Sequence, residues 1–199
     1  MTESPSTDGN AVFALKARNL IRIALANPVE ERSPVGEDGA MLLRPATADD
    51  FTFLTEMLLE AYNWDGTPWF TLDKLRAEDK AWRYVAGWPR PTDFGVIAEV
   101  DGTPAGAAWA RVLTADRPGY GYIADDVPEL SLGVSPAFRR QGIARAVLTE
   151  LITVARSSTP YTRLSLSVDP ANHAAKLYRS LGFETVGTVE TSETMVLQL

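Results

Sequence analysis

The C-terminal half of the chain has the most regular pattern of hydrophobic and polar positions. Leu130, Leu132 and Val134 alternate with small or polar residues, which predicts a strand. A helix is predicted next, up to about residue 156, because apolar residues recur every four positions at Ile143, Val147, Leu151 and Ala155. A strand, a helix and two final strands are then predicted over residues 163–168, 170–181, 183–189 and 194–199.

The preceding segment predicts two helices and three more strands. The first helix begins with Thr47 as N-cap and Asp50 three positions later, and it runs to about residue 62. The turn dipeptide Asp101-Gly102 predicts a hairpin between two strands. The strands are predicted over residues 41–44, 95–100 and 104–113, and the second helix over 71–80. The order of elements predicts an α+β domain with a mixed, mostly antiparallel sheet of six to seven strands and about four helices.

The first 40 residues are predicted to be an N-terminal extension of a compact domain that occupies residues 41–199. Residues 1–10 have a disordered composition, residues 11–26 have an amphipathic helical pattern, and residues 28–40 are a linker rich in Pro, Gly and Glu. The helix would pack on the domain or on a second subunit, which would make a homodimer. Alternatively, it would serve as a substrate lid or a partner-binding helix.

The composition excludes several classes of partner and of active site. The 199 residues include 26 acidic and 19 basic ones, and a net charge of −7 argues against a nucleic-acid or anionic-membrane partner. The chain has no cysteine and only one histidine, His173, so thiolate nucleophiles, Ser-His-Asp hydrolases and multi-His or zinc-thiolate metal sites are excluded. We therefore expect no metal. No apolar run reaches the ~18 residues of a membrane span, and the N-terminus has no basic targeting segment, so we expect a cytoplasmic protein.

One candidate site is the junction between the strand at 130–134 and the following helix. Its sequence is Arg139-Arg140-Gln141-Gly142-Ile143-Ala144, followed by Arg145. Backbone amides and the helix dipole at such a junction favour phosphate, and Gly142 adds no side chain to obstruct it. Three arginines reverse the local charge of an acidic chain. Alone, the loop could equally be a solvated helix N-terminus.

The second candidate site is in the helix predicted over 170–181. Asn172, Ala175 and Tyr178 are spaced three apart, so they would lie along one side of that helix, with Ala175 leaving a bare patch. Alone, Tyr178 could equally be a buried structural tyrosine.

Together, the two segments resemble the GCN5-related N-acetyltransferase (GNAT) family. The first resembles the Arg/Gln-x-x-Gly-x-Gly/Ala acetyl-CoA motif, with Ala144 as the permitted last residue. The second resembles Asn-x-x-Ala-x-x-Leu-Tyr-x-x-x-Gly-Phe, which here ends at Phe183. The resemblance covers residues 41–199. It implies the GNAT fold, with a sheet that splays between its fourth and fifth strands.

The resemblance also implies roles for individual residues. Acetyl-CoA would be the cosubstrate, its pantetheine arm would pair with the strand at Leu132 and Val134, and the amides from 139 to 145 would hold the pyrophosphate. Tyr178 would protonate the thiolate of departing CoA, which a phenol of ordinary pKa ~10 can do. The implied cofactor-binding residues are Leu132, Gly133, Val134, Arg139, Arg140, Gln141, Gly142, Ile143, Ala144, Arg145, Asn172 and Ala175.

The amine acceptor must lose a proton before it attacks the thioester. Glu129, at the start of the motif strand, is the first choice of base, although it could also be a solvated strand-end carboxylate; Glu99, Asp125, Asp126 and water compete. His173 is rejected because a helix N-terminus disfavours its charged form and it should face solvent. Ser167 stands where some relatives carry a glutamate, a departure from the ribosomal-protein N-terminal acetyltransferases.

The sequence leaves the acceptor open. Aromatic residues that could line its pocket are Tyr62, Trp64, Trp69, Phe70, Trp82, Trp88 and Trp109, and acidic residues that could attract a cationic amine are Asp65, Asp93, Asp125 and Asp126. We expect an acetyl-CoA-dependent N-acetyltransferase acting on a small-molecule primary amine. The alternatives are acetylation of a protein N-terminus or lysine, and a catalytically silent acyl-CoA-binding module.

Overall fold

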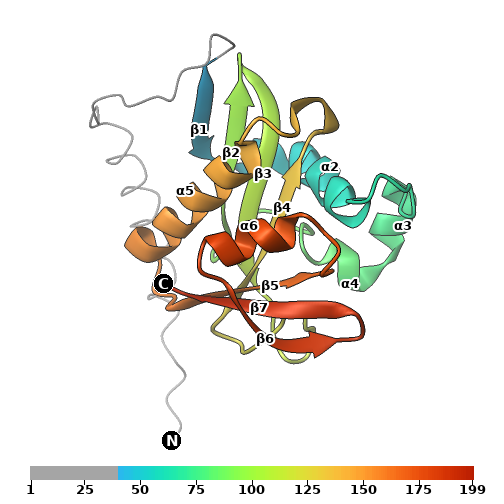
Figure 1. Ribbon diagram of the computed structural model, residues 1–199, viewed down its shortest axis with the longest axis vertical. Coiled ribbons are helices and arrows are strands. Elements are labelled where there is room, and N and C mark those ends of the chain that lie inside the picture. Colours follow the sequence, from blue (N-terminus) through green and yellow to red (C-terminus); the bar gives the residue numbers. More distant parts are fainter. Residues whose placement is uncertain (1–39) are drawn as a thin grey trace, which may run out of the picture.

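The computed structural model describes residues 40–199, which form a seven-stranded sheet with helices on both faces (Figure 1). The sheet order is β1-β2-β3-β4-β5-β7-β6, and every pair of neighbouring strands except β4 and β5 is antiparallel. The strands are β1 (Met41–Pro45), β2 (Phe94–Val100), β3 (Thr103–Val112), β4 (Pro128–Val134), β5 (Arg163–Val168), β6 (Glu184–Val189) and β7 (Ser192–Gln198). The predicted α+β class and its mixed sheet are confirmed.

The sheet opens between β4 and β5. These parallel strands are paired at a single position, Glu129 with Ser165. From Leu130 onward, the edge of β4 that faces β5 therefore has no strand partner within residues 40–199, whereas its other edge pairs with β3 along its whole length. This is the splay that was expected between the fourth and fifth strands.

Two hydrophobic cores flank the sheet. Strand β3 alternates between them, with Ala108 and Ala110 facing one core and Ala107 and Trp109 the other. Figure 1 shows α5 (Ile143–Ser158) and α6 (Ala174–Ser180) over one face, while α2 (Phe51–Tyr62), α3 (Leu72–Ala77) and α4 (Asp79–Trp82) cover the other. Two short 3-10 helices, Ala48–Asp50 and Pro136–Phe138, precede α2 and follow β4.

Two predicted helices differ from those observed. The helix expected over 71–80 is divided into α3 and α4, because Glu78 between them has an extended backbone with ψ of 98°. The helix expected to start at Pro170 starts only at Ala174, because the Asn172 side chain accepts a hydrogen bond from the Ala174 amide at 2.9 Å and forms a turn before the helix. Asn172 therefore precedes α6 and does not lie along its side.

Two glycines in the sheet allow neighbouring helices to pack closely against it. A Cβ on Gly106 of β3 would come within 2.7 Å of the Ile143 side chain, so α5 packs directly on this strand. On the opposite face, a Cβ on Gly133 of β4 would come within 2.3 Å of the Met57 carbonyl oxygen of α2. Both glycines thus allow close packing of helices against the sheet.

Most of the predicted N-terminal extension, including its helix at 11–26, lies outside the described residues. Within residues 40–199, no helix is both long and apolar enough to cross a bilayer.

Candidate active site

A cavity of about 660 Å³ lies at the opening between β4 and β5. Its walls come mainly from α2, β4, the end of β5 and α6, and from the loops after α2, after α4, at Tyr120 and before α5. The predicted site residues that line it are Glu129, Leu132, Gly133, Val134, Arg139, Arg140, Ala144, Asn172 and Tyr178.

The start of α5 leaves backbone amides unbonded. The first hydrogen bond of this helix runs from the Ala146 amide to the Gly142 carbonyl at 3.1 Å, and the amides of Ile143, Ala144 and Arg145 donate to no group in the described part of the chain. Gly142 is the N-cap and has a φ of 82°, a left-handed conformation that glycine adopts without a steric penalty. Backbone shape thus gives a second reason for glycine here.

The arginines of this loop differ in their partners. Arg139 pairs with Glu60 of α2 at 2.7 Å, and Arg145 donates to the Ser180 hydroxyl at 3.0 Å. Arg140 is exposed, lines the cavity and has no ion pair among residues 40–199. The side chains of Ile143 and Ala175 lie in the hydrophobic core, so Ala175 does not leave the bare patch that its spacing suggested.

Tyr178 reaches the cavity from α6. It is 7% exposed and packs edge-on against Phe183 with ring centroids 5.7 Å apart. Burial raises the pKa of the Tyr178 phenol well above its ordinary value, because the charged phenolate would lose its solvation. The phenol is therefore protonated throughout the neutral range.

Glu129 is buried, with 3% of its surface exposed. Its Oε1 accepts hydrogen bonds from the Tyr84 hydroxyl and from the Gly121 amide, the latter at 2.7 Å. Burial raises the pKa of Glu129 to about 7, although the Tyr84 and Gly121 hydrogen bonds oppose this shift. The alternative of a solvated strand-end carboxylate is wrong.

The competing carboxylates lie elsewhere. Glu99 is paired with Arg44 at 2.7 Å, and Asp125 accepts from the Tyr122 hydroxyl at 2.8 Å. Asp126 lies 3.6 Å from Arg163. None of these three carboxylates lines the cavity, and His173, which contributes to its wall, is exposed as expected.

The aromatic residues divide between the cavity and the core. Tyr62, Trp64 and Phe70 line the cavity, whereas Trp69 is 66% exposed outside it. The indoles of Trp88 and Trp109 donate to the backbone carbonyls of Thr47 and Tyr84 at 2.8 Å each, and these rings pack in the core with Trp82 nearby.

Two further tyrosines, Tyr84 and Tyr120, line the cavity and were not singled out from the sequence. Their rings are stacked with centroids 6.2 Å apart, and Tyr62 packs on Phe70 at 4.7 Å. No local motif marks either tyrosine, because each reaches Glu129 or its neighbours only through the tertiary fold.

Asp93 was expected to attract a cationic amine, but it is not available for that role. Its side chain is fully buried and pairs with Arg111, so its charge is already compensated. Asp65 accepts a hydrogen bond from the Thr67 amide at 2.8 Å in an exposed turn and does not line the cavity.

Sequence and structure comparisons place this architecture among known proteins. The model of the acetyltransferase (GNAT) family matches residues 55–183. The N-alpha-acetyltransferase RimI of Mycobacterium tuberculosis is 45% identical over 58 residues, which are 29% of this chain and 34% of that protein. The chain thus spans about a third of the length of this curated relative.

Solved structures match over most of their length. A ribosomal-protein-alanine N-acetyltransferase from Brucella melitensis is 28% identical with a TM-score of 0.53, covering 79% of this chain and 99% of that one. The structure of YncA from Salmonella typhimurium with its cofactor acetyl-CoA is 24% identical with a TM-score of 0.54, covering 80% of this chain and 94% of that one. The second match supports the fold alone. With its splayed sheet, its loop before α5 and a family match over well more than half of its length, the chain belongs to the acetyltransferase (GNAT) family.

Proposed function

We propose that this protein transfers the acetyl group of acetyl-CoA to a primary amine, which attacks the thioester directly. One observation carries the proposal: the same cavity is lined by a buried carboxylate, Glu129, and a buried phenol, Tyr178. The residues around them fit the cosubstrate. The unbonded amides at the start of α5 suit a pyrophosphate, and the unpaired edge of β4 suits the amide groups of a pantetheine arm.

Each of the two side chains would handle one proton. Glu129, with its pKa near 7, accepts a proton from the substrate ammonium. The amine nitrogen then bonds to the thioester carbonyl carbon, and the carbon–sulfur bond breaks. Tyr178 donates its proton to the departing thiolate and regains one from the newly acylated nitrogen. The products are an amide, CoA as its thiol and one proton, which Glu129 releases to solvent.

For the acceptor we propose a small-molecule primary amine. The rings of Tyr62, Phe70, Tyr84 and Tyr120 gather next to Glu129, and such a wall suits a compact amine with an apolar body. A second candidate, the N-terminal amine of a polypeptide, is favoured by the two relatives whose names describe N-alpha and ribosomal-protein-alanine acetylation. A cytoplasmic location and a homodimer remain predictions from the sequence.

The test measures CoA-thiol release from acetyl-CoA by the full-length protein with two sets of acceptors. One set contains arylalkylamines and diamines, and the other contains short peptides with free N-termini. We expect turnover with the first set. Turnover confined to peptides would transfer the proposal to the second candidate, and acetyl-CoA binding without turnover on either set would indicate a silent binding module.

Two variants test the assigned groups. Tyr178→Phe should lower kcat about 100-fold while the Kd for acetyl-CoA changes little, because only the acid is removed. Gly142→Glu should abolish acetyl-CoA binding in calorimetry, since it places negative charge beside the unbonded amides. The control Thr149→Glu adds the same charge to an exposed position on α5 and should bind normally. Normal binding by Gly142→Glu would contradict the phosphate assignment.

A further inference from the structure

The two oxygens of the Glu129 carboxylate have different surroundings. Oε1 accepts from the Tyr84 hydroxyl and from the Gly121 amide, whereas Oε2 has no hydrogen-bond partner among residues 40–199, although it is buried. The Tyr84 oxygen in turn accepts from the Tyr120 amide at 2.6 Å, which directs its single proton toward Glu129. Oε1 thus accepts two hydrogen bonds, whereas Oε2 accepts none within the described part of the chain.

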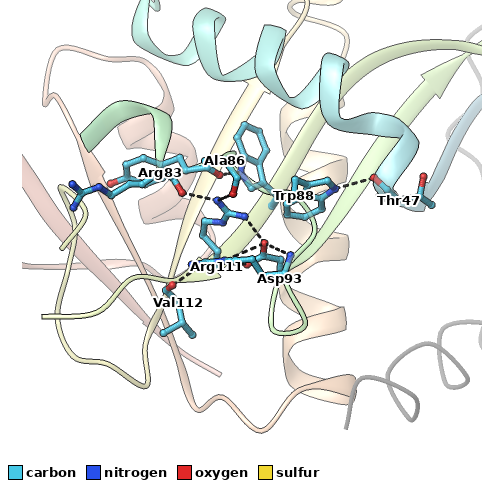
Figure 2. Close-up of polar contacts among 10 residues, drawn as sticks. Thr47, Arg83, Ala86, Trp88, Asp93, Arg111 and Val112 are labelled. Carbon is cyan, nitrogen blue, oxygen red and sulfur yellow. Dashed lines mark hydrogen bonds and ion pairs between the residues drawn. The ribbon is translucent and has the colours of Figure 1, made fainter. Parts of the chain in front are cut away.

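Side chains of β3 donate hydrogen bonds to the backbone of Tyr84 and its neighbours. The Trp109 indole donates to the Tyr84 carbonyl at 2.8 Å. Figure 2 shows the Arg111 guanidinium between Asp93 and the carbonyls of Arg83 and Ala86, to which it donates at 2.5 and 3.1 Å. Arg111 is also the cross-strand neighbour of Glu129. Adjacent strands therefore fix both the carboxylate and the turn that carries its phenol partner.

The loop of residues 119–121 packs closely against Tyr84, Glu129 and β5. A Cβ on Gly119 would come within 2.0 Å of Glu129 Oε2 and 2.6 Å of the Tyr84 oxygen. A Cβ on Gly121 would come within 2.4 Å of the Leu166 backbone. Because both positions need glycine, the loop 119–121 can close over the Tyr84–Glu129 pair and bring the Gly121 amide to Oε1.

We propose that Tyr84 is a positioning residue for the general base: its phenol, with the Gly121 amide, occupies Oε1 of Glu129 and leaves Oε2 as the oxygen that takes the proton of the acceptor amine. This inference rests on the proposed acetyl transfer. Tyr84 does not contact the reacting atoms in this scheme. It sets the orientation and the basicity of the group that does.

The electrostatics agree with this arrangement. Burial raises the pKa of Tyr84 well above its ordinary value, so its hydroxyl remains a donor across the neutral range. Its hydrogen bond lowers the pKa of Glu129 against the effect of burial, and the positive charge of Lys80 on α4 acts in the same direction. Further titratable groups around this site include Tyr62 of α2, Tyr120 of the loop, Glu78 and Arg83 on either side of α4, and Arg111 of β3, whose charge is paired with Asp93.

The experiment is the pH dependence of kcat/KM for wild type and Tyr84→Phe. Glu129 must be ionised to act, so kcat/KM rises with pH as Glu129 loses its proton. Loss of the Tyr84 donor destabilises the carboxylate, and the acidic limb should move upward by about one pH unit, which lowers kcat/KM about tenfold at pH 6.5. The activity should recover toward pH 9, and the Kd for acetyl-CoA should stay the same.

Two further proteins make the result decisive. Tyr122→Phe removes another phenol from the same loop, one that bonds to Asp125, and should leave the limb in place. Replacement of Tyr84 by 3,5-difluorotyrosine keeps the ring and strengthens the donor, so the limb should move downward. This second arm remains available if Tyr84→Phe does not fold.

Glu129→Gln separates the inference from the function beneath it. If Glu129→Gln is inactive but both Tyr84 replacements leave the acidic limb unmoved, or lower kcat/KM equally at every pH, the role of Tyr84 is overturned and the base assignment stands. If Glu129→Gln retains wild-type activity, Glu129 is not the base and the inference is overturned together with that assignment.

Discussion

The two ends of the cavity are built in different ways. The end proposed for acetyl-CoA is formed mainly by one continuous segment, from β4 through the loop to the start of α5, and it offers backbone groups. The end proposed for the amine is formed by side chains from α2, from the turn at Tyr84, from the loop at Tyr120 and from β4. The first depends on chain path, and the second depends on buried polar contacts between distant segments.

This difference fits the separate tasks proposed for the two ends. A cosubstrate with a fixed structure can be held by backbone amides, which need only a glycine with positive φ and a helix start. A base must have a tuned pKa, and burial beside selected donors provides that tuning. Variants should therefore affect one end at a time.

The largest effect is expected from Arg111→Met. Arg111 and Asp93 have side chains only 1% and 0% exposed, and loss of the arginine leaves the buried carboxylate with only the partly exposed Arg90 at 3.1 Å. The free energy of unfolding should fall by about 3–5 kcal/mol, measured by urea denaturation. The folded fraction should bind acetyl-CoA normally but turn over slowly, because the turn that carries Tyr84 loses two of its hydrogen bonds.

The matched control for this variant is Arg163→Met. Its ion pair with Asp126 spans 3.6 Å at the surface and should contribute less than ~1 kcal/mol. Equal losses in the two variants would show that the buried pair contributes no more stability than a surface pair. Weaker acetyl-CoA binding by Arg111→Met would show that its effect is not confined to the acceptor end.

The second prediction adds one methyl group at each end of the cavity, through a Gly→Ala substitution. In Gly119→Ala the new carbon would collide with Glu129 and Tyr84, and in Gly133→Ala it would collide with the Met57 carbonyl of α2. Each should cost about 2–3 kcal/mol of stability. Gly119→Ala should lower kcat about tenfold at constant Kd for acetyl-CoA, whereas Gly133→Ala should weaken acetyl-CoA binding by displacing β4. Both quantities are measurable by steady-state kinetics and calorimetry.

Gly102→Ala serves as the control for these two variants. This glycine has a φ of 74° in the β2–β3 turn, and a Cβ added there would meet no atom within 4 Å. The substitution should cost about 1 kcal/mol through backbone strain alone, with kinetics unchanged. If all three variants behaved alike, the two ends of the cavity would not be independent.

Local signals predicted several backbone elements well. The Asp101-Gly102 turn, the strand at β4 and the glycine before α5 all depend on near neighbours in sequence, and the structure has each of them close to its expected bounds. The start of α6 was misplaced because the Asn172 side chain, and not Pro170, sets it. Such a turn competes with the helix over only two residues, which periodicity does not resolve.

The acceptor end was less predictable for a physical reason. Tyr84 and Glu129 are 45 positions apart in sequence, and Tyr84 and Tyr120 are 36 apart, so no spacing rule links them. The sequence shows the charge of Asp93, which suggested a role in attracting the amine. It does not show that Asp93 is buried against Arg111. Glu129 was found only through its place at the start of the motif strand.

The smallest expected effect concerns stability and pH. Folding raises the pKa of Glu129 from an ordinary 4.5 to about 7, so between these values the folded state binds a proton that the unfolded state has lost. Stability should therefore fall as pH rises from 4.5 through 7. Glu129→Gln has no such titration, so its free energy of unfolding should increase relative to that of wild type by about 2 kcal/mol between pH 5 and pH 8. Urea denaturation at the two pH values measures this difference. If the difference between variant and wild type is the same at pH 5 and pH 8, Glu129 is already ionised at pH 5 in the folded protein and its pKa is not raised. A more stable variant that has lost its activity would show that the buried carboxylate is retained for catalysis at a cost to the fold.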